Sequence, residues 1–294
     1  MIFVLLPRVE ILDLAGPLQA FSEANAKRER YRIRLCATKP RIEAHQGLVL
    51  SDLQPLPEDA RDALVIVPGM PYAATERVER SVIHWLIDAA KAGAHIASVC
   101  TGAFPLGEAG LLDGRRCTTH WSRTSELARR YPRARVLEDR LYVSEGNVTT
   151  SAGIASGIDM ALALIEQADG PIVAAEVARE MVVYLRRDGA QEQHSVYLDY
   201  RTHLHPGVHR VQDFIVRNPA TRATLDELAD LAGMSPRNLT RTFRAATGIS
   251  VLDFATRVRL ELARTLLHDP GLSVAAVAAR CGMSARQLRR LAHA

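Results

Sequence analysis

The sequence predicts an α/β part, in which helices cover both faces of a mostly parallel sheet, followed by a smaller all-α part. Three observations predict this division. Short apolar runs alternate with helical patterns over residues 1–170, as in parallel strands joined by helices. A helix-turn-helix pattern then occurs twice, 49 residues apart. Residues 208–294 hold thirteen arginines, no lysine and seven acidic residues, a net charge of +6, whereas the whole chain carries +4.

The expected strands are short and mostly apolar, as strands buried on both faces of a sheet require. They cover residues 2–6, 64–67, 94–99, 141–143 and 147–150. A strand over 31–37 alternates apolar residues with arginines, which predicts a less buried position. Helices are expected over 17–26, with Pro17 at the first position, and over 76–92, 100–106, 155–167 and 172–185.

A chain of 294 residues is long enough for two domains with separate cores. We expect a first domain over residues 1–188, a polar linker over 189–207 and a second domain over 208–294. No apolar run approaches the roughly 18 residues of a membrane span. Four widely spaced cysteines predict neither a disulfide framework nor a metal site, and they fit a reduced, cytoplasmic setting. Dinucleotide and phosphate-loop fingerprints are missing, so we expect no cofactor.

The first helix-turn-helix lies between Leu225 and Arg244. Apolar residues at helical spacing predict a helix from Leu225, and Gly233 ends it because glycine tolerates positive φ. Ser235 is suited to be the N-cap of the second helix, and Pro236 its first residue. That helix presents side chains able to reach phosphates or base edges. They are Arg237, Asn238, Thr240, Arg241 and Arg244.

The same pattern recurs from Val274, with Gly282 at the turn. The corresponding candidate DNA-binding residues are Arg286, Gln287, Arg289 and Arg290. Two such copies on one chain resemble the DNA-binding domain of AraC-type transcription regulators, and the resemblance covers residues 208–294. Phe243 is suited to anchor the first recognition helix in the core, but its counterpart is Ala292, two residues before the sequence ends. We therefore expect a weaker second motif and unequal half-sites.

Cys100 follows an expected strand and precedes an expected helix, so it lies at the carboxyl end of a parallel strand, where ligands bind in such sheets. A sharp strand-to-helix turn there has the geometry of a nucleophile elbow. The helix N-terminus beneath the sulfur favours the thiolate, the reactive form. The alternative is a small buried cysteine that packs as an apolar residue.

The N-terminal part resembles the ThiJ/PfpI superfamily, built like class I glutamine amidotransferase domains. The matching segments are Ile11–Pro17, Val65–Gly69, Ala97–Ala103, Ala109–Gly114, Thr118–Trp121 and Thr150–Gly153. The resemblance implies a flavodoxin-like sheet with the elbow cysteine in a pocket. It also implies an acidic residue after the first strand that reaches toward the sulfur, which is Asp13 here. A protonated Asp13 would donate a hydrogen bond to the thiolate; the alternative role is capping the helix near Pro17.

Further groups are expected around the sulfur. Backbone N–H groups around Gly69 and Thr101, together with Gly102, are candidates for binding a ligand such as an oxyanion. His120 is a candidate for the same pocket, the alternative being a structural histidine at a strand end. Hydrolytic members of the superfamily often place histidine directly after the cysteine, where this chain has Thr101. The Cys-Thr-Gly sequence instead resembles the isonitrile hydratase branch and the regulator branch, which argues against peptidase activity.

Together the two resemblances imply a transcription regulator whose first domain senses a small molecule and controls the second. The expected partners are double-stranded operator DNA, an effector, RNA polymerase and a second copy of the chain, bound through the N-terminal domain. A non-catalytic cysteine site is favoured. Two alternatives stay open: a cysteine-dependent hydratase or hydrolase fused to a DNA-binding tail, and a thiol redox sensor oxidised to the sulfenate.

Overall fold

The computed structural model describes residues 1–183, 187, 189, 193, 195–267 and 271–292. The chain divides into two compact units, Met1–Gln193 and His194–Ala294, which are described separately. Within the described ranges, no helix combines the length and the apolar character that crossing a membrane requires.

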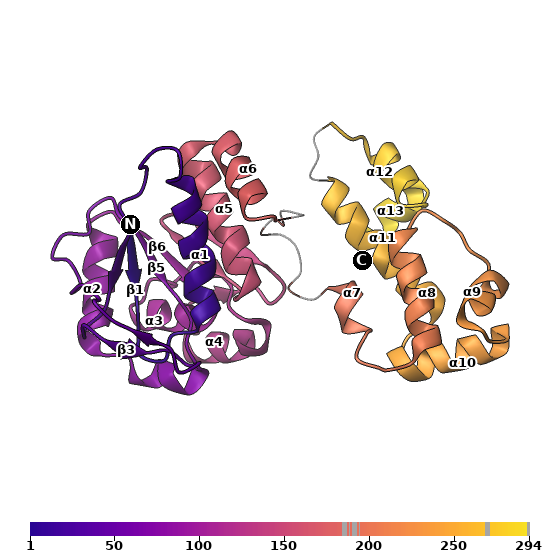
Figure 1. Ribbon diagram of the computed structural model, residues 1–294, viewed down its shortest axis with the longest axis horizontal. Helices are drawn as coiled ribbons and strands as arrows, with labels where there is room; N and C mark the ends of the chain where they lie inside the picture. Colours follow the sequence, from indigo (N-terminus) through magenta and orange to yellow (C-terminus); the bar gives the residue numbers. More distant parts are fainter. Residues whose placement is uncertain (184–186, 188, 190–192, 194, 268–270, 293–294) are drawn as a thin grey trace. The chain divides into compact units, whose positions relative to one another are not determined.

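A six-stranded sheet forms the centre of the first unit (Figure 1), with strand order β2-β1-β5-β6-β10-β9. The first five strands in this order run parallel, and β9 pairs antiparallel with β10. The strands are β1 (Ile2–Val4), β2 (Arg34–Cys36), β5 (Leu64–Val67), β6 (His95–Val99), β9 (Tyr142–Glu145) and β10 (Val148–Ser151). The order of the parallel strands is that of a flavodoxin-like sheet, so the predicted fold class is confirmed.

Helices cover both faces of the sheet because successive residues of each strand point to opposite sides. Phe3 of β1 packs into one core, whereas Ile2 and Val4 pack into the other. The first core lies beneath α1 (Ile11–Ala24), α5 (Ala155–Asp169) and α6 (Pro171–Glu180), which Figure 1 shows together on one side of the sheet. The second lies beneath α2 (Arg80–Lys91), α3 (Ala103–Glu108) and α4 (Thr124–Arg130).

The helix after β1 differs from the sequence prediction. It begins at Ile11, six residues before the expected start, and Pro17 lies inside it. Pro17 cannot donate the usual backbone hydrogen bond. However, Leu14, Pro17 and Phe21 are all buried on the face that packs against α5 and α6, and this burial compensates for the lost bond. Asp13 therefore lies in the first turn of a helix rather than in a loop.

The bounds of two other predicted helices also differ in the structure. The expected helix over 76–92 is split into a 3₁₀ helix, η1 (Tyr72–Arg77), and α2, with extended backbone at Val78. Helix α6 ends at Glu180 instead of continuing to 185, and residues 184–186 lie outside the described part. Two small sheets were not expected from the sequence. They pair β3 (Ile42–Glu43) with β4 (Val49–Leu50), and β7 (Arg116–Cys117) with β8 (Arg135–Val136).

The second unit is helical, as predicted. Its helices are α7 (Val196–Asp199), α8 (Pro206–Arg217), α9 (Leu225–Ala232), α10 (Pro236–Thr247), α11 (Val251–Leu267), α12 (Val274–Arg280) and α13 (Ala285–Ala292). Gly233 and Gly282 have φ values of +70° and +66°, which is the left-handed conformation expected at both turns. One core surrounds the first helix-turn-helix and includes Phe243, and a smaller core around Leu288 supports the second.

The segment expected to be a linker belongs partly to the second unit. Val196 and Tyr200 pack against the core around Phe243, and Gln212 donates a 2.6 Å hydrogen bond to the Tyr200 carbonyl. This packing was not visible in the sequence because residues 190–207 lack the periodicity of an amphipathic helix. By contacts, the boundary between the units falls between 193 and 194.

Candidate functional site

Cys100 lies directly after β6, at the carboxyl edge of the parallel strands. Residues Cys100–Gly102 form the 3₁₀ turn η2, and α3 follows immediately. The Cys100 backbone has φ +56°, which residues other than glycine adopt rarely. This sharp turn has the elbow geometry expected from the sequence. Cys100 is only 9% exposed there.

Glycine backbones crowd this elbow at three positions. A Cβ at Gly153 would lie 2.9 Å from Cys100 Sγ, and a Cβ at Gly69 would lie 2.9 Å from Cys100 Cβ. A Cβ at Gly102 would lie 2.1 Å from the carbonyl oxygen of Val67. Gly69 and Gly153 therefore form walls of the thiol site. Gly102, a candidate for ligand binding from the sequence, instead packs against the end of β5.

Asp13 is fully buried beside the elbow. Its Oδ1 accepts a 2.8 Å hydrogen bond from the Ile154 N–H, and its Oδ2 faces Gly69, where a Cβ would lie 2.3 Å away. This contact with the start of α5 excludes the alternative role of capping a helix near Pro17. Burial raises the pKa of Asp13 to about 6; the bond from Ile154 opposes this shift, and the negative charge of Glu10 adds to it.

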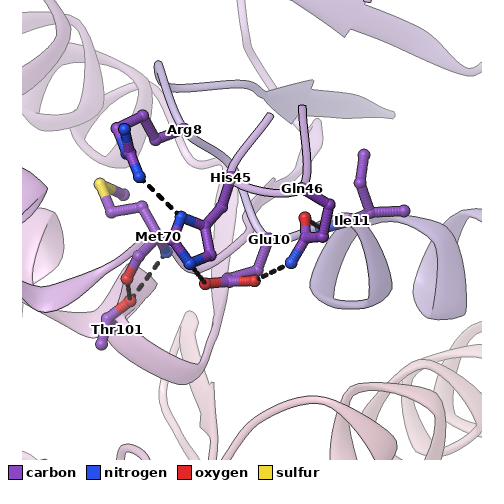
Figure 2. A network of polar contacts seen from close by, with 7 residues as sticks. All are labelled: Arg8, Glu10, Ile11, His45, Gln46, Met70 and Thr101. Carbon is purple, nitrogen blue, oxygen red and sulfur yellow. Dashed lines mark hydrogen bonds and ion pairs between the residues drawn. The ribbon is translucent and has the colours of Figure 1, made fainter. Parts of the chain in front are cut away.

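Two backbone N–H groups face this pair, as the sequence suggested. The Gly69 N–H faces the Asp13 carboxyl and the Thr101 N–H faces the sulfur, and each lowers the pKa of the group that it faces. The buried Thr101 hydroxyl accepts a 2.8 Å hydrogen bond from the Met70 N–H and donates to the Met70 carbonyl (Figure 2). That side chain therefore ties the elbow to the loop after β5.

Residues 118–120 pass along the other side of the elbow. The buried Thr119 hydroxyl donates a 2.7 Å hydrogen bond to the Cys100 carbonyl. His120 caps the 3₁₀ helix η3 (Trp121–Arg123), where its Nδ1 lies 2.8 Å from Ser122 Oγ. The His120 ring also lies against Trp121, with 5.5 Å between ring centroids. His120 thus caps a short helix, and Thr119, which was not singled out from the sequence, contacts the elbow.

A chain of polar side chains lies beside the first turn of α1 (Figure 2). Arg8 Nη2 is 2.8 Å from His45 Nδ1, and His45 Nε2 is 4.0 Å from Glu10 Oε1. Gln46 donates to Glu10 and accepts a 3.2 Å hydrogen bond from the Ile11 N–H. Sequence reasoning missed this network because its members lie more than thirty residues apart in the chain and form no local pattern.

The Cys100 thiol is protonated at neutral pH, which corrects the expectation of a thiolate. Burial is the main cause that raises its pKa, followed by the negative charge of Asp13; Glu10 adds less, and the Thr101 N–H opposes the shift. Above pH 6 the pair is therefore a carboxylate beside a neutral thiol.

The first recognition helix, α10, has a buried side and an exposed side. Leu239 and Phe243, one turn apart, are fully buried, and the candidates Arg237, Thr240, Arg241 and Arg244 are exposed. Ser235 caps the helix by accepting a hydrogen bond from the Asn238 N–H. The Asn238 side chain is free of capping and accepts a 3.0 Å hydrogen bond from Arg241 Nη2. Asn238 therefore orients the Arg241 guanidinium.

The second recognition helix, α13, uses its equivalent residue differently. Gln287 Oε1 accepts hydrogen bonds from the Ser284 N–H at 3.0 Å and from the Ser284 hydroxyl at 3.1 Å, which completes a capping box. Leu288 is buried, whereas Arg286, Gln287, Arg289 and Arg290 are exposed. The Ala292 side chain lies outside the described part. Gln287 thus stabilises the start of the helix, whereas its equivalent Asn238 orients an arginine.

All four cysteines are free and buried. Across the residues that the structure describes, no group of three or more histidine, cysteine, aspartate or glutamate side chains is arranged to hold a metal ion. Of the candidate residues, Asp13, Gly69 and Thr101 contact the Cys100 elbow, and those of the second unit lie on α10 and α13.

The raised pKa of Asp13 makes the stability of the first unit depend on pH. Its folded-state value of about 6 exceeds the ordinary 3.8, so the folded state binds the proton more tightly. That stabilisation is complete below about pH 4 and is lost as pH rises through 6. Between pH 4 and 7, the free energy of unfolding of wild type should fall by about 3 kcal/mol relative to Asp13→Asn. Urea titrations at each pH, followed by the fluorescence of Trp85 and Trp121, both in this unit, measure the free energy of unfolding. If the values for wild type and Asp13→Asn change with pH in parallel, the raised pKa of Asp13 is contradicted.

The protonated thiol should react slowly with iodoacetamide at pH 7. Asp13→Asn removes the adjacent negative charge and lowers the thiol pKa, so alkylation of Cys100 should become about tenfold faster or more. Glu23→Gln removes a carboxylate from the other end of α1 and serves as the matched control, with no change in rate. Peptide mass spectrometry over time measures each cysteine separately. Equal rates in wild type and Asp13→Asn would show that the carboxylate does not control the thiol.

Comparisons with known proteins agree with this architecture. The DJ-1/PfpI family matches residues 1–167, and a helix-turn-helix domain matches residues 228–293. The chain is 30% identical over 286 residues to the HTH-type transcriptional regulator CdhR of Pseudomonas aeruginosa, covering 95% of this chain and 83% of that protein. It is 31% identical over 182 residues to the isonitrile hydratase of Pseudomonas putida, covering 57% of this chain and 71% of that enzyme.

A solved structure shows the same fold for the first unit. The crystal structure of an AraC family transcriptional regulator from Pseudomonas putida matches with a TM-score of 0.54 and 21% identity, covering 61% of this chain and 97% of that one. The DJ-1/PfpI match spans more than half of the chain, and the match to CdhR extends across both units. The chain therefore belongs to the DJ-1/PfpI family, within the group of transcription regulators that carry an AraC-type helix-turn-helix domain after it.

Proposed function

We propose that this regulator binds double-stranded operator DNA through α10 and α13, and that a small molecule at the Cys100 elbow controls the binding. The observation that carries the proposal is the repeated motif in the second unit. In each copy a left-handed glycine turn leads into a capped helix with one side buried and an arginine-bearing side exposed. Such a helix fits the major groove, where arginine reads guanine edges and contacts phosphates.

The charge distribution supports the assignment of DNA binding to the second unit. Residues 208–294 carry a net +6, which leaves −2 for the rest of the chain. Cationic side chains release counterions from DNA when they bind phosphates, and this supplies sequence-independent affinity. The exposed arginines of α10 and α13 supply that charge next to candidate base-reading groups.

The proposed effector binds without a covalent bond. A thiol kept neutral by burial and by a neighbouring carboxylate is a poor nucleophile and a poor substrate for oxidation. Above pH 6 the Asp13 carboxylate accepts hydrogen bonds, and the N–H groups of Gly69 and Thr101 donate them. Together these groups suit a small polar ligand.

We further propose a homodimer that forms through the first unit. Leu12 of α1 and Ile172 of α6 support it, because they expose 61% and 75% of their surface on helices of this unit.

RNA polymerase is a further proposed partner, and family membership alone supports it. The cytoplasm is the proposed location, supported by the four free thiols and by the role of DNA as a partner.

A cysteine-dependent hydratase is the second candidate function. The elbow geometry of Cys100 and the match to isonitrile hydratase over the first unit favour it. The raised thiol pKa opposes it, because burial and the negative charge of Asp13 disfavour the thiolate that would act as the nucleophile. Turnover of an isonitrile by wild type and its loss in Cys100→Ser would establish this enzyme activity in place of pure sensing.

Selection of bound sequences from random DNA with the full chain tests the proposed function. We expect a two-part consensus whose halves are centred about one helical turn apart, as two linked recognition helices require. Log affinity for that consensus should fall linearly with log salt as phosphate contacts are lost. Recovery of no consensus, with affinity independent of salt, would contradict DNA binding by this chain.

The two halves of that consensus should differ in their dependence on arginine. Arg241→Ala should cost about 1–3 kcal/mol of binding and relax base preference in one half, because Arg241 is held in place by Asn238. Asn238→Ala should produce part of the same loss. Arg290→Ala should act mainly on the salt dependence, reducing the slope by about 1. The affinity of each variant for operators mutated in one half or the other, measured over a range of salt concentrations, shows these losses.

The matched control is Arg217→Ala, which removes an exposed arginine of α8 outside both motifs and should leave base preference unchanged. Equal and base-specific losses from Arg241→Ala and Arg290→Ala would show that both helices read bases in the same way.

A further inference from the structure

A pocket of about 680 Å³ lies between the two helix-turn-helix motifs of the second unit. Helix α11 forms one side of it, the first motif contributes α9 and part of α10, and the second contributes its glycine turn and α13. This volume is typical of pockets that hold a small organic molecule. We call it the intermotif pocket, and its lining includes Arg222, Leu225, Leu252, Arg259, Met283 and Arg290.

Much of this lining is apolar. Leu225 at the start of α9 and Leu252 near the start of α11 expose 41% and 70% of their surface. Met283, which follows the second glycine turn, lines the same space. Leucine side chains that are left in water gain free energy when an apolar group covers them. The intermotif pocket therefore favours a ligand with an apolar body, which the phosphate backbone of DNA does not provide.

The charged part of the lining is cationic. Arg222, Arg259 and Arg290 line the pocket, and none of the described residues that line it is acidic. Burial, followed by the positive charge of Arg222, lowers the pKa of Arg259, so two cations lie near each other. An anion bound beside them would offset their repulsion. The intermotif pocket therefore favours a ligand that also carries a negative charge.

Backbone carbonyls fix the positions of two of these arginines. Arg259 donates to the Pro219 carbonyl at 2.8 Å and to the Thr221 carbonyl at 3.1 Å. Arg222 donates to the Gly282 carbonyl from Nε at 3.3 Å and from Nη2 at 3.1 Å. A guanidinium carries more N–H groups than these bonds use, so donors remain for a ligand. Because the fold itself positions both guanidinium groups, less conformational entropy is lost when a ligand binds them.

Candidate DNA-binding residues border the intermotif pocket. Thr240 of α10 lines it from one motif, and Gln287 and Arg290 of α13 line it from the other. All three side chains are exposed on the recognition helices, on the sides that the proposed function directs toward DNA. A ligand that covers these side chains prevents them from contacting a base or a phosphate.

We propose that the intermotif pocket binds a small anion with an apolar body, such as an aromatic or aliphatic carboxylate or sulfonate, and that the bound anion competes with operator DNA. Arg222 and Arg259 hold the anionic group, and Leu225, Leu252 and Met283 cover the apolar body. The binding step is independent of the proposed function, whereas the competition rests on it, because the competition requires α10 and α13 to face DNA. The regulator thereby gains a point of control within its DNA-binding unit.

Fluorescence titration of the full chain with anilinonaphthalene sulfonate tests the binding step. This dye is an anion with an apolar body. Leu252→Glu places a carboxylate at the exposed wall of the pocket, so it should weaken the affinity for the dye at least about tenfold. The matched control is Leu204→Glu, because Leu204 is 97% exposed in the same unit and does not line the pocket. Both variants share any other apolar surface that binds the dye, so the difference between them isolates the intermotif pocket.

The role of the positive charge is tested with Arg222→Gln and a neutral dye. Phenylnaphthylamine has the same apolar body as the anionic dye but lacks the sulfonate. Arg222→Gln should weaken the affinity for the sulfonate at least about fivefold and leave that for phenylnaphthylamine within about twofold, which also shows that the pocket is intact. Arg217→Gln, an exposed position of α8 outside the pocket, should change neither affinity. If Leu252→Glu and Arg222→Gln both bind the sulfonate as wild type does, the proposed site is wrong.

Competition with DNA is measured with the operator that wild type selects from random DNA. Saturating anionic dye should lower the affinity of wild type for this operator at least about fivefold, and the operator should displace the dye in turn, because linkage is reciprocal. The same dye concentration should leave the operator affinity of Leu252→Glu unchanged. Operator affinity that does not respond to dye bound in the wild-type pocket would overturn the competition. A chain that selects no operator contradicts the proposed function and the competition together, and the dye titrations still decide whether the pocket binds the anion.

Discussion

The close packing of backbone against Cys100 is the constraint on which the first unit depends. Strands β1, β5, β6 and β10 end together, and the segments that follow them converge on one side chain. Gly69 and Gly153 meet it without side chains of their own, and the Cys100 backbone adopts φ +56° to fit between them. Such strain persists only where the surrounding structure fixes it, so the elbow is held by the whole carboxyl edge of the sheet.

The chemistry of the site follows from this packing. Tight walls exclude water, and loss of water raises the pKa of both acids, Asp13 and Cys100. The two acids also repel each other when ionised, so the thiol keeps its proton while the carboxyl, the stronger acid, ionises first. A low thiol pKa, which favours the nucleophilic thiolate, needs the opposite environment, with a nearby cation. The elbow of this chain therefore combines the backbone geometry of a nucleophile elbow with a neutral thiol.

Local signals in the sequence predicted the elements well, and contacts between distant segments decided what was missed. The continuous apolar run Leu64–Val67 became β5 with the same ends, and Gly233 and Ser235 took the predicted positions at the turn. Pro17 was misleading because burial of its helix outweighs one lost hydrogen bond. Neither the network around His45 nor the packing of residues 196–200 has a periodic pattern, since each depends on residues far along the chain.

The divergence of the two helix-turn-helix copies has a simple stereochemical origin. In a capping box, the third residue of a helix reaches back to the N-cap, and glutamate or glutamine has the length to do so. Gln287 occupies this position in α13 and bonds to Ser284. The equivalent Asn238 is one methylene shorter, leaves its cap to the Ser235 hydroxyl alone, and turns its carbonyl toward Arg241 one turn along. The difference of one methylene group therefore explains why Gln287 stabilises the start of its helix, whereas Asn238 orients Arg241.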